Sequence, residues 1–173
     1  MTYVFKTQHV LESYRRDNPI DRQNRFGNAH MVDELEAQPA TQLCETDAPK
    51  RILIVDDDPA LVETLSFRLR KQGYSVFNAL TGADGIQRAQ NERPDVVLLD
   101  LGLPDQDGLE VCSKLADDPD TCGTPVIVVS GQDRPNIVRE TRAAGCEFYV
   151  RKPYDPNALL TLIQAALDQA ESW

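Results

Sequence analysis

Short apolar runs alternate with amphipathic segments along residues 50–173. The runs are dominated by apolar residues, and they cover 51–56, 74–79, 95–100, 125–130 and 147–150. Strands of a parallel sheet are buried on both faces, so they are apolar throughout rather than alternating with polar residues. The pattern therefore predicts five parallel strands.

The segments between these runs carry apolar residues at helical spacing, together with helix start and stop signals. The first segment starts at Asp58-Pro59, an N-cap followed by proline at the first helical position, and it ends near Gly73. The last segment starts in the same way at Asp155-Pro156. The other three helices are expected over 81–93, 109–116 and 136–144.

Strict alternation of strand and helix predicts a parallel sheet with helices on both faces. We therefore expect one doubly wound α/β domain over residues 50–173. Residues 1–49 differ, because they are rich in polar and charged side chains and keep no sustained apolar period. We interpret them as an irregular N-terminal extension, either a passive tail or an arm that folds on a partner.

The net charge of the chain argues against two classes of partner. Its 173 residues carry a net charge of −10, with a sequence pI near 4.6. Nucleic acids and anionic membranes attract basic surfaces, so we expect neither as a partner. The sequence has no signal-peptide h-region and no apolar stretch long enough to span a bilayer. A cytoplasmic protein is the expected class.

The cysteines form no C-x-x-C pair, and they are Cys44, Cys112, Cys122 and Cys146. Such spacing gives no metal site. Because the cytoplasm keeps thiols reduced, we expect reduced cysteines.

Candidate chemistry collects where the predicted strands end. Asp56 and Asp57 end the first strand, Asp100 ends the third, Ser130 ends the fourth, and Lys152 follows the fifth. Ligands of an open α/β sheet bind outside the carboxyl ends of its strands. Carboxylates that converge there repel one another and favour a hard cation such as Mg²⁺. An aspartate beside that metal can attack phosphorus, with an ammonium and a hydroxyl on the phosphoryl oxygens.

Each of these residues also has an ordinary explanation. A single aspartate after a strand is usually a cap, a lysine before proline is usually solvated, and Ser-Gly after a strand is usually a turn. Their joint placement at the ends of four strands favours a phosphoryl-transfer site.

Four motifs resemble the receiver domain family of bacterial response regulators, typified by the chemotaxis regulator. They are ILIVDDDP at 52–59, VVLLDLGLPDQDG at 96–108, PVIVVSG at 125–131 and AGCEFYVRKP at 144–153. The motifs follow the family's order and cover a whole domain. The resemblance implies a flavodoxin-like five-stranded sheet in the order 2-1-3-4-5.

The resemblance also implies the acceptor and the metal ligands. Asp100 corresponds to the phosphoacceptor. Asp56, Asp57, Asp100 and the backbone carbonyl of Gly102 correspond to the Mg²⁺ ligands. Gly102 lacks a side chain where many relatives contact the attacking water, and Gln132 occupies the partner position after Ser130. We therefore transfer no rate of dephosphorylation.

A second set of residues is implied for the switch. Ser130 and Lys152 correspond to the residues that contact the phosphoryl group, and Tyr149 to the aromatic residue that turns inward as Ser130 moves. Alternatively, Tyr149 is simply a half-buried aromatic residue of a strand.

The resemblance implies partners as well. The phosphoryl donor is a histidine kinase or a histidine phosphotransfer protein. The output is a protein target that contacts residues 136–171, and a phosphorylation-dependent homodimer is one form of it. Such a module is not an enzyme beyond slow, Mg²⁺-dependent self-phosphorylation and self-dephosphorylation.

The sequence argues against two other functions and leaves a third open. A phosphatase of the haloacid dehalogenase type needs D-x-D directly after its strand, whereas Asp100 is followed by Leu101 and Gly102. A calcium-binding loop starting at Asp105 fails because Ala116 occupies the position that requires glutamate. A docking module with the same fold that works without phosphorylation stays open as the alternative.

Overall fold

The computed structural model describes residues 48–146 and 148–170. Strands and helices alternate in the order β1 Arg51–Val55, α2 Pro59–Lys71, β2 Ser75–Ala79, α3 Gly82–Glu92, β3 Val96–Leu99, α4 Gly108–Asp117, β4 Val126–Ser130, α5 Ile137–Ala143, β5 Phe148–Arg151 and α6 Pro156–Ala170. The predicted extension 1–49 lies outside the described residues, except for its last two. Glu147, where the fifth strand was expected to start, lies outside them too.

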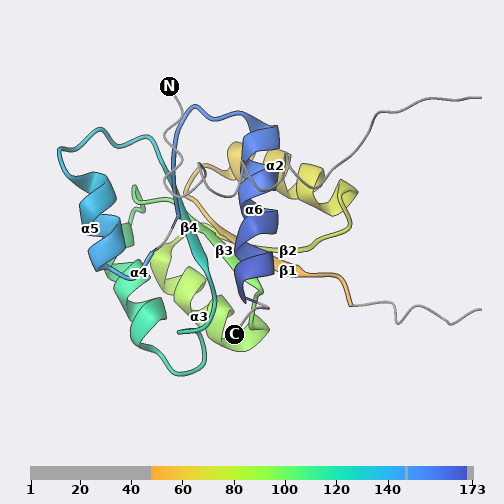
Figure 1. Cartoon of the computed structure of the whole chain (residues 1–173), viewed down its shortest axis with the longest axis horizontal. Coiled ribbons are helices and arrows are strands. Elements are labelled where there is room, and N and C mark those ends of the chain that lie inside the picture. The colour runs from red at the N-terminus through yellow and green to blue at the C-terminus, as the bar shows by residue number, and fades with distance from the viewer. Residues whose placement is uncertain (1–47, 147, 171–173) are drawn as a thin grey trace, which may run out of the picture.

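The strands form one parallel sheet in the order β2-β1-β3-β4-β5 (Figure 1). β3 lies in the middle, with Ile52 of β1 paired with Val96 on one side and Val126 of β4 paired with Val97 on the other. The predicted fold class and strand order are therefore confirmed.

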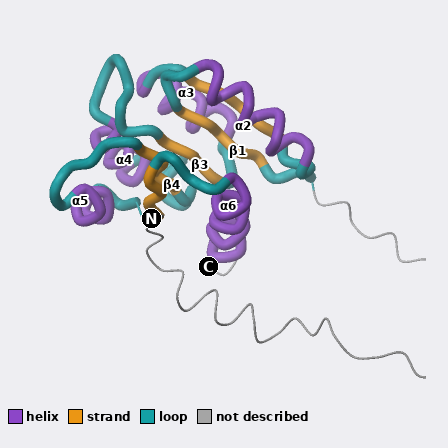
Figure 2. Tube along the Cα trace, turned by 90° about the horizontal axis from the view of Figure 1, so that it is seen from above, coloured by secondary structure: helices purple, strands orange, loops and turns teal. Residues whose placement is uncertain are grey.

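The sheet is buried on both faces between helices (Figure 2). In β1, Ile52 and Ile54 pack into a core with α2 and α6, whereas Leu53 and Val55 pack into a second core with α3, α4 and α5. All four side chains are at most 1% exposed. This two-sided burial is the reason why the strands are continuous apolar runs.

The predicted helix signals make the expected contacts. The Asp58 carboxylate accepts hydrogen bonds from the amides of Ala60 and Leu61, at 3.0 and 3.2 Å. Thr81 caps α3 in the same manner. Gly73 follows α2 with a φ of +90°, a conformation that glycine adopts without a steric penalty. Within the described residues, no helix is long and apolar enough to cross a membrane.

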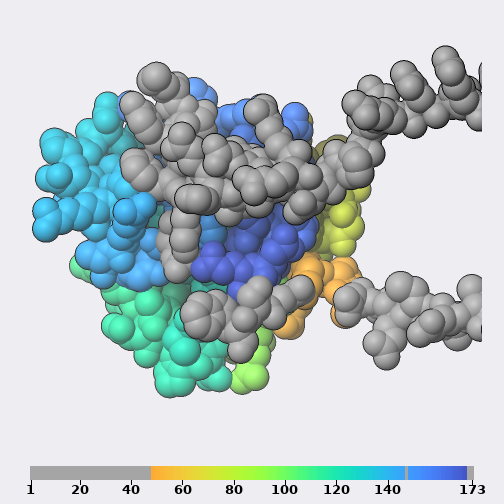
Figure 3. Space-filling view, viewed as in Figure 1, coloured from red at the N-terminus to blue at the C-terminus, as the bar shows by residue number. Residues whose placement is uncertain are grey.

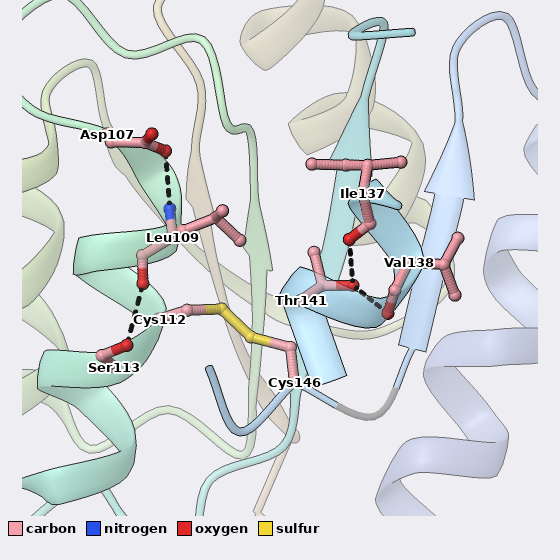
Figure 4. Close-up of a disulfide and its surroundings, with 8 residues drawn as sticks. All are labelled: Asp107, Leu109, Cys112, Ser113, Ile137, Val138, Thr141 and Cys146. Carbon is pink, nitrogen blue, oxygen red and sulfur yellow. Dashed lines mark hydrogen bonds between the residues drawn. A yellow bond between two sulfur atoms is a disulfide. The ribbon is translucent and has the colours of Figure 1, made fainter. Parts of the chain in front are cut away.

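The expectation of reduced cysteines is wrong for two of the four. Cys112 of α4 and Cys146, which precedes β5, form a disulfide with a Cα–Cα distance of 6.5 Å (Figure 4). Both residues are buried, whereas Cys122 is free and exposed. The two cysteines are 34 residues apart in the sequence. Spacing motifs detect only cysteines that are near in sequence, so they do not reveal a pair formed by packing.

Reducing this disulfide is expected to lower the stability of the domain. A cross-link over this separation lowers the entropy of the unfolded chain and stabilises the fold by about 3–4 kcal/mol. Urea unfolding of the full chain with and without reductant measures the difference. The Cys122→Ser variant is the matched control, because its loss of free energy on reduction should equal that of the parent. An unfolding midpoint that reductant leaves unchanged would count against the cross-link.

Candidate functional site

An ammonium group lies between two buried carboxylates just beyond the carboxyl ends of the strands. Nζ of Lys152 is 2.6 Å from Oδ2 of Asp56 and 2.9 Å from Oδ1 of Asp100. The side chains of Asp56 and Asp100 are only 5% and 8% exposed. These residues follow β1, β3 and β5, so the fold brings together side chains that are far apart in the sequence.

Backbone hydrogen bonds of the sheet fix the backbone positions of these residues. The amide of Asp100 donates to the carbonyl of Val55 at 2.8 Å, and the amide of Lys152 donates to the carbonyl of Ser130 at 2.9 Å. The amide of Asp56 likewise donates to β2. The ladder bonds thus continue past the strand ends, and they hold the backbone of each charged residue in place.

The pKa of Lys152 is raised above its ordinary value of 10.5. Burial alone would lower it, but hydrogen bonds to Asp56 and Asp100 and the charges of these carboxylates outweigh that effect. Because the pKa of Lys152 is higher in the folded state than in the unfolded chain, the protonated lysine stabilises the fold fully below pH 10.5. This stabilisation is lost as the pH rises through the folded-state pKa. Lys152 is therefore charged at neutral pH, where it faces two buried carboxylates.

Gly102 contacts the Asp100 carboxylate through its amide, a contact that the sequence did not predict. The N–H of Gly102 donates to Oδ2 of Asp100. A Cβ at residue 102 would lie 2.9 Å from that oxygen, closer than ordinary packing allows. Glycine therefore lets the chain fold tightly over the carboxylate. The backbone carbonyl of Gly102 was the atom predicted to bind metal.

Ser130 and Tyr149 both contact the β4–α5 loop, residues 131–136. Ser130 is fully buried, and its Oγ accepts a hydrogen bond from the amide of Gln132 at 3.1 Å. The hydroxyl of Tyr149 donates to the carbonyl of Gln132 at 3.3 Å. Tyr149 is 5% exposed, and burial raises the pKa of its phenol. Its ring therefore lies inside the domain in this structure, joined to the same loop residue as Ser130.

Two ion pairs join the β4–α5 loop to its neighbours, and the sequence indicated neither. Arg151 contacts Asp133 at 2.8 Å, and Arg134 contacts Asp107, the N-cap of α4, at 3.9 Å. These groups are exposed, so each pair contributes little stability. Their positions nevertheless connect the loop to β5 and to the start of α4.

The oxygen donors of this site suit Mg²⁺. Asp56, Asp57 and Asp100 supply hard carboxylate oxygens, and the buried negative charge exceeds the single charge of Lys152. Among the described residues, no three His, Cys, Asp or Glu side chains already converge as a metal site. The ammonium of Lys152 lies between two of the carboxylates, and the Asp57 side chain is exposed. The donor set fits the ion, although its carboxylates are not gathered around one point.

Comparison with known families identifies the family to which the chain belongs. The model of the response regulator receiver domain matches residues 52–164. The chain belongs to this family. The receiver domain implied by the four sequence motifs is therefore confirmed, and with it the general class of phosphoacceptors of two-component systems.

Individual receiver proteins are similar over the same part of the chain. Protein PilH of Pseudomonas aeruginosa is 38% identical over 117 residues, which are 68% of this chain and 97% of PilH. Several other curated relatives, among them transcriptional regulatory proteins, are about twice as long as the matched part, so the chain spans about half of their length.

Solved receiver structures match the fold. A CheY-like receiver domain protein of Methanospirillum hungatei superposes with a TM-score of 0.68 at 35% identity, covering 72% of this chain and 98% of that one. The BeF₃-activated receiver domain of DrrB superposes with a TM-score of 0.62 at 32% identity, covering 69% of this chain and 98% of that one.

Proposed function

We propose that residues 50–173 form a receiver domain that accepts a phosphoryl group on Asp100, with residues 1–49 as its extension. The donor is the phosphohistidine of a histidine kinase or of a histidine phosphotransfer protein. The observation that carries the proposal is the position of the Lys152 ammonium between the buried carboxylates of Asp56 and Asp100. A partly exposed cation with two buried acidic partners is poised to meet the oxygens of a transferred group.

The residues of the site divide the reaction between them. A carboxylate oxygen of Asp100 bonds to phosphorus as the donor's phosphorus–nitrogen bond breaks, and the imidazole keeps the electron pair. Lys152 and the Ser130 hydroxyl then contact the phosphoryl oxygens. Mg²⁺, held by Asp56, Asp57, Asp100 and the carbonyl of Gly102, would offset the charge on those oxygens when bound. We propose that the same site also carries out slow self-phosphorylation and self-dephosphorylation.

The contacts of Gln132 support a switch. Ser130 accepts from the Gln132 amide, and Tyr149 donates to the Gln132 carbonyl. When Ser130 turns toward a phosphoryl group, the loop loses this hydrogen bond, and its movement reaches Tyr149 through the second one. A phosphoryl group thus biases a two-state element by a local change of charge.

The output surface lies next to this loop. The loop leads into α5, which lies at the margin of the molecule beside α4 (Figure 3). We propose that residues 136–171 contact the downstream protein target, and that a phosphorylation-dependent homodimer would use the same surface. A docking module that needs no phosphorylation is the alternative that the next experiment separates.

Beryllofluoride with Mg²⁺, which mimics a bound phosphoryl group, is expected to change the amide NMR shifts of the full chain. The largest changes should fall on Asp100, Gly102, Gln132 and Lys152, and they should extend to Tyr149 and α5, because these residues share hydrogen bonds or a loop. Fluoride with Mg²⁺ but without beryllium is the control. Spectra that stay the same with all three components would rule out the switch and leave the docking module.

A further inference from the structure

A carboxylate outside the predicted site joins the loop after Asp100 to a neighbouring helix. Asp105 lies in the β3–α4 loop, residues 100–107. Its Oδ1 accepts from the amide of Gly82 at 2.8 Å, and its Oδ2 accepts from the amide of Ala83 at 2.9 Å. Both amides belong to the first turn of α3, where a negative charge is favoured. These backbone hydrogen bonds, first that of Ala83 and then that of Gly82, lower the pKa of Asp105.

The helix and the loop approach each other more closely than most residues would allow. A Cβ at Gly82 would lie 2.6 Å from Nε2 of Gln106 and 2.8 Å from Cγ2 of Val111. Gln106 in turn accepts a hydrogen bond from Lys114 of α4 at 2.6 Å. The contact between the helix and the loop is therefore made by Gly82 on one side and by the side chains of Asp105 and Gln106 on the other. The hydrogen bonds of Asp105 are only one part of it.

The remaining contacts of the loop hold its two ends. The amide of Gly108 donates to the carbonyl of Leu101 at 3.3 Å, and Asp107 caps α4. At the other end, Gly102 donates to Oδ2 of Asp100. Asp105 lies between these ends and ties the outer part of the loop to α3. Gly102 and Asp105 therefore belong to one short loop, which is held at both ends and at its outer part.

We propose that Asp105 is a positioning residue of the acceptor site, which anchors the β3–α4 loop on the first turn of α3 and so holds Gly102 against Asp100. The inference deepens the proposed function and rests on it for its consequence, since Gly102 also supplies the carbonyl assigned to Mg²⁺. Residues that orient a metal ligand without touching the metal typically change affinity by an order of magnitude or more.

Asp118, the C-cap of α4, provides a matched control, because it contacts α3 near the opposite end of that helix. Its carboxylate accepts from Gln90 of α3 at 2.7 Å and from the amide of Asp120 at 2.8 Å. The pKa of Asp118 is lowered as well, chiefly by the bond from Gln90. Asp118→Ala therefore removes comparable hydrogen bonds, yet it leaves the β3–α4 loop intact.

The test follows the Gly102 amide shift and the Mg²⁺ affinity of the full chain by NMR titration. Asp105→Ala is expected to move the Gly102 resonance in the absence of any ion and to weaken Mg²⁺ binding about tenfold. Asp105→Asn keeps one acceptor oxygen and should fall between Ala and the parent, and it remains informative if the alanine variant does not fold. Asp118→Ala should match the parent in both measurements.

The outcomes separate the positioning role from the proposed function. An Asp105 variant that is less stable but keeps the parent's Gly102 shift and Mg²⁺ affinity would show that Asp105 only caps α3. If Gly102 moves but the parent chain takes up no phosphoryl group, the anchoring is correct and the proposed function is wrong.

Discussion

Asp100→Asn is expected to abolish the uptake of a phosphoryl group. A carboxamide has nearly the shape of the carboxylate, but it lacks the charged nucleophilic oxygen that forms the acyl phosphate. Lys152 still pairs with Asp56 in the variant, so the fold should persist. Intact mass after incubation with Mg²⁺ and acetyl phosphate measures the uptake, and circular dichroism confirms the fold.

Asp95→Asn is the matched control for this variant, because Asp95 lies at the opposite end of β3 and contacts Arg51. It should be phosphorylated as fully as the parent. Undiminished uptake by Asp100→Asn would mean that another residue is the acceptor.

Lys152→Ala is expected to cost both stability and activity. Without the ammonium, the carboxylates of Asp56 and Asp100 are left buried and mutually repulsive, which destabilises a fold by about 3 kcal/mol. Loss of the cation from the phosphoryl oxygens should slow transfer about 100-fold. Urea unfolding and the rate of phosphorylation by acetyl phosphate measure the two effects at a pH near 7.

Lys71→Ala is the control for the loss of a lysine, since Lys71 is exposed and lies over the ring of Phe67. It should lose less than about 1 kcal/mol, as surface substitutions usually do. A Lys152→Ala variant as stable and as active as the parent would contradict the account of the site.

The elements of the fold were predictable because their causes are local. The strands are apolar throughout since both faces are buried, and Asp58 and Thr81 start helices through hydrogen bonds to the next few residues. The order of the strands followed from the four motifs, and Asp56, Asp100 and Lys152 were placed together because parallel strands end at one edge of a sheet.

The features that the sequence did not reveal depend on packing between distant segments. In the sequence, Asp105 belongs to the motif at 96–108 and to a calcium-binding pattern that fails, and neither indicates its partners Gly82 and Ala83, which precede it by more than 20 residues. The Cys112–Cys146 disulfide likewise joins a helix to the segment that precedes β5. Neither contact is marked by an apolar period or by a motif spacing in the sequence. Both become visible only when the positions of the packed segments are known.

The acceptor itself can be identified directly by chemical trapping. The full chain is phosphorylated with acetyl phosphate and Mg²⁺, reduced with borohydride to convert an aspartyl phosphate to homoserine, and digested for peptide sequencing by mass spectrometry. Our account predicts homoserine at residue 100, with Asp56 and Asp57 unchanged. Homoserine at another aspartate, or phosphate incorporated with residue 100 still aspartate, would contradict it.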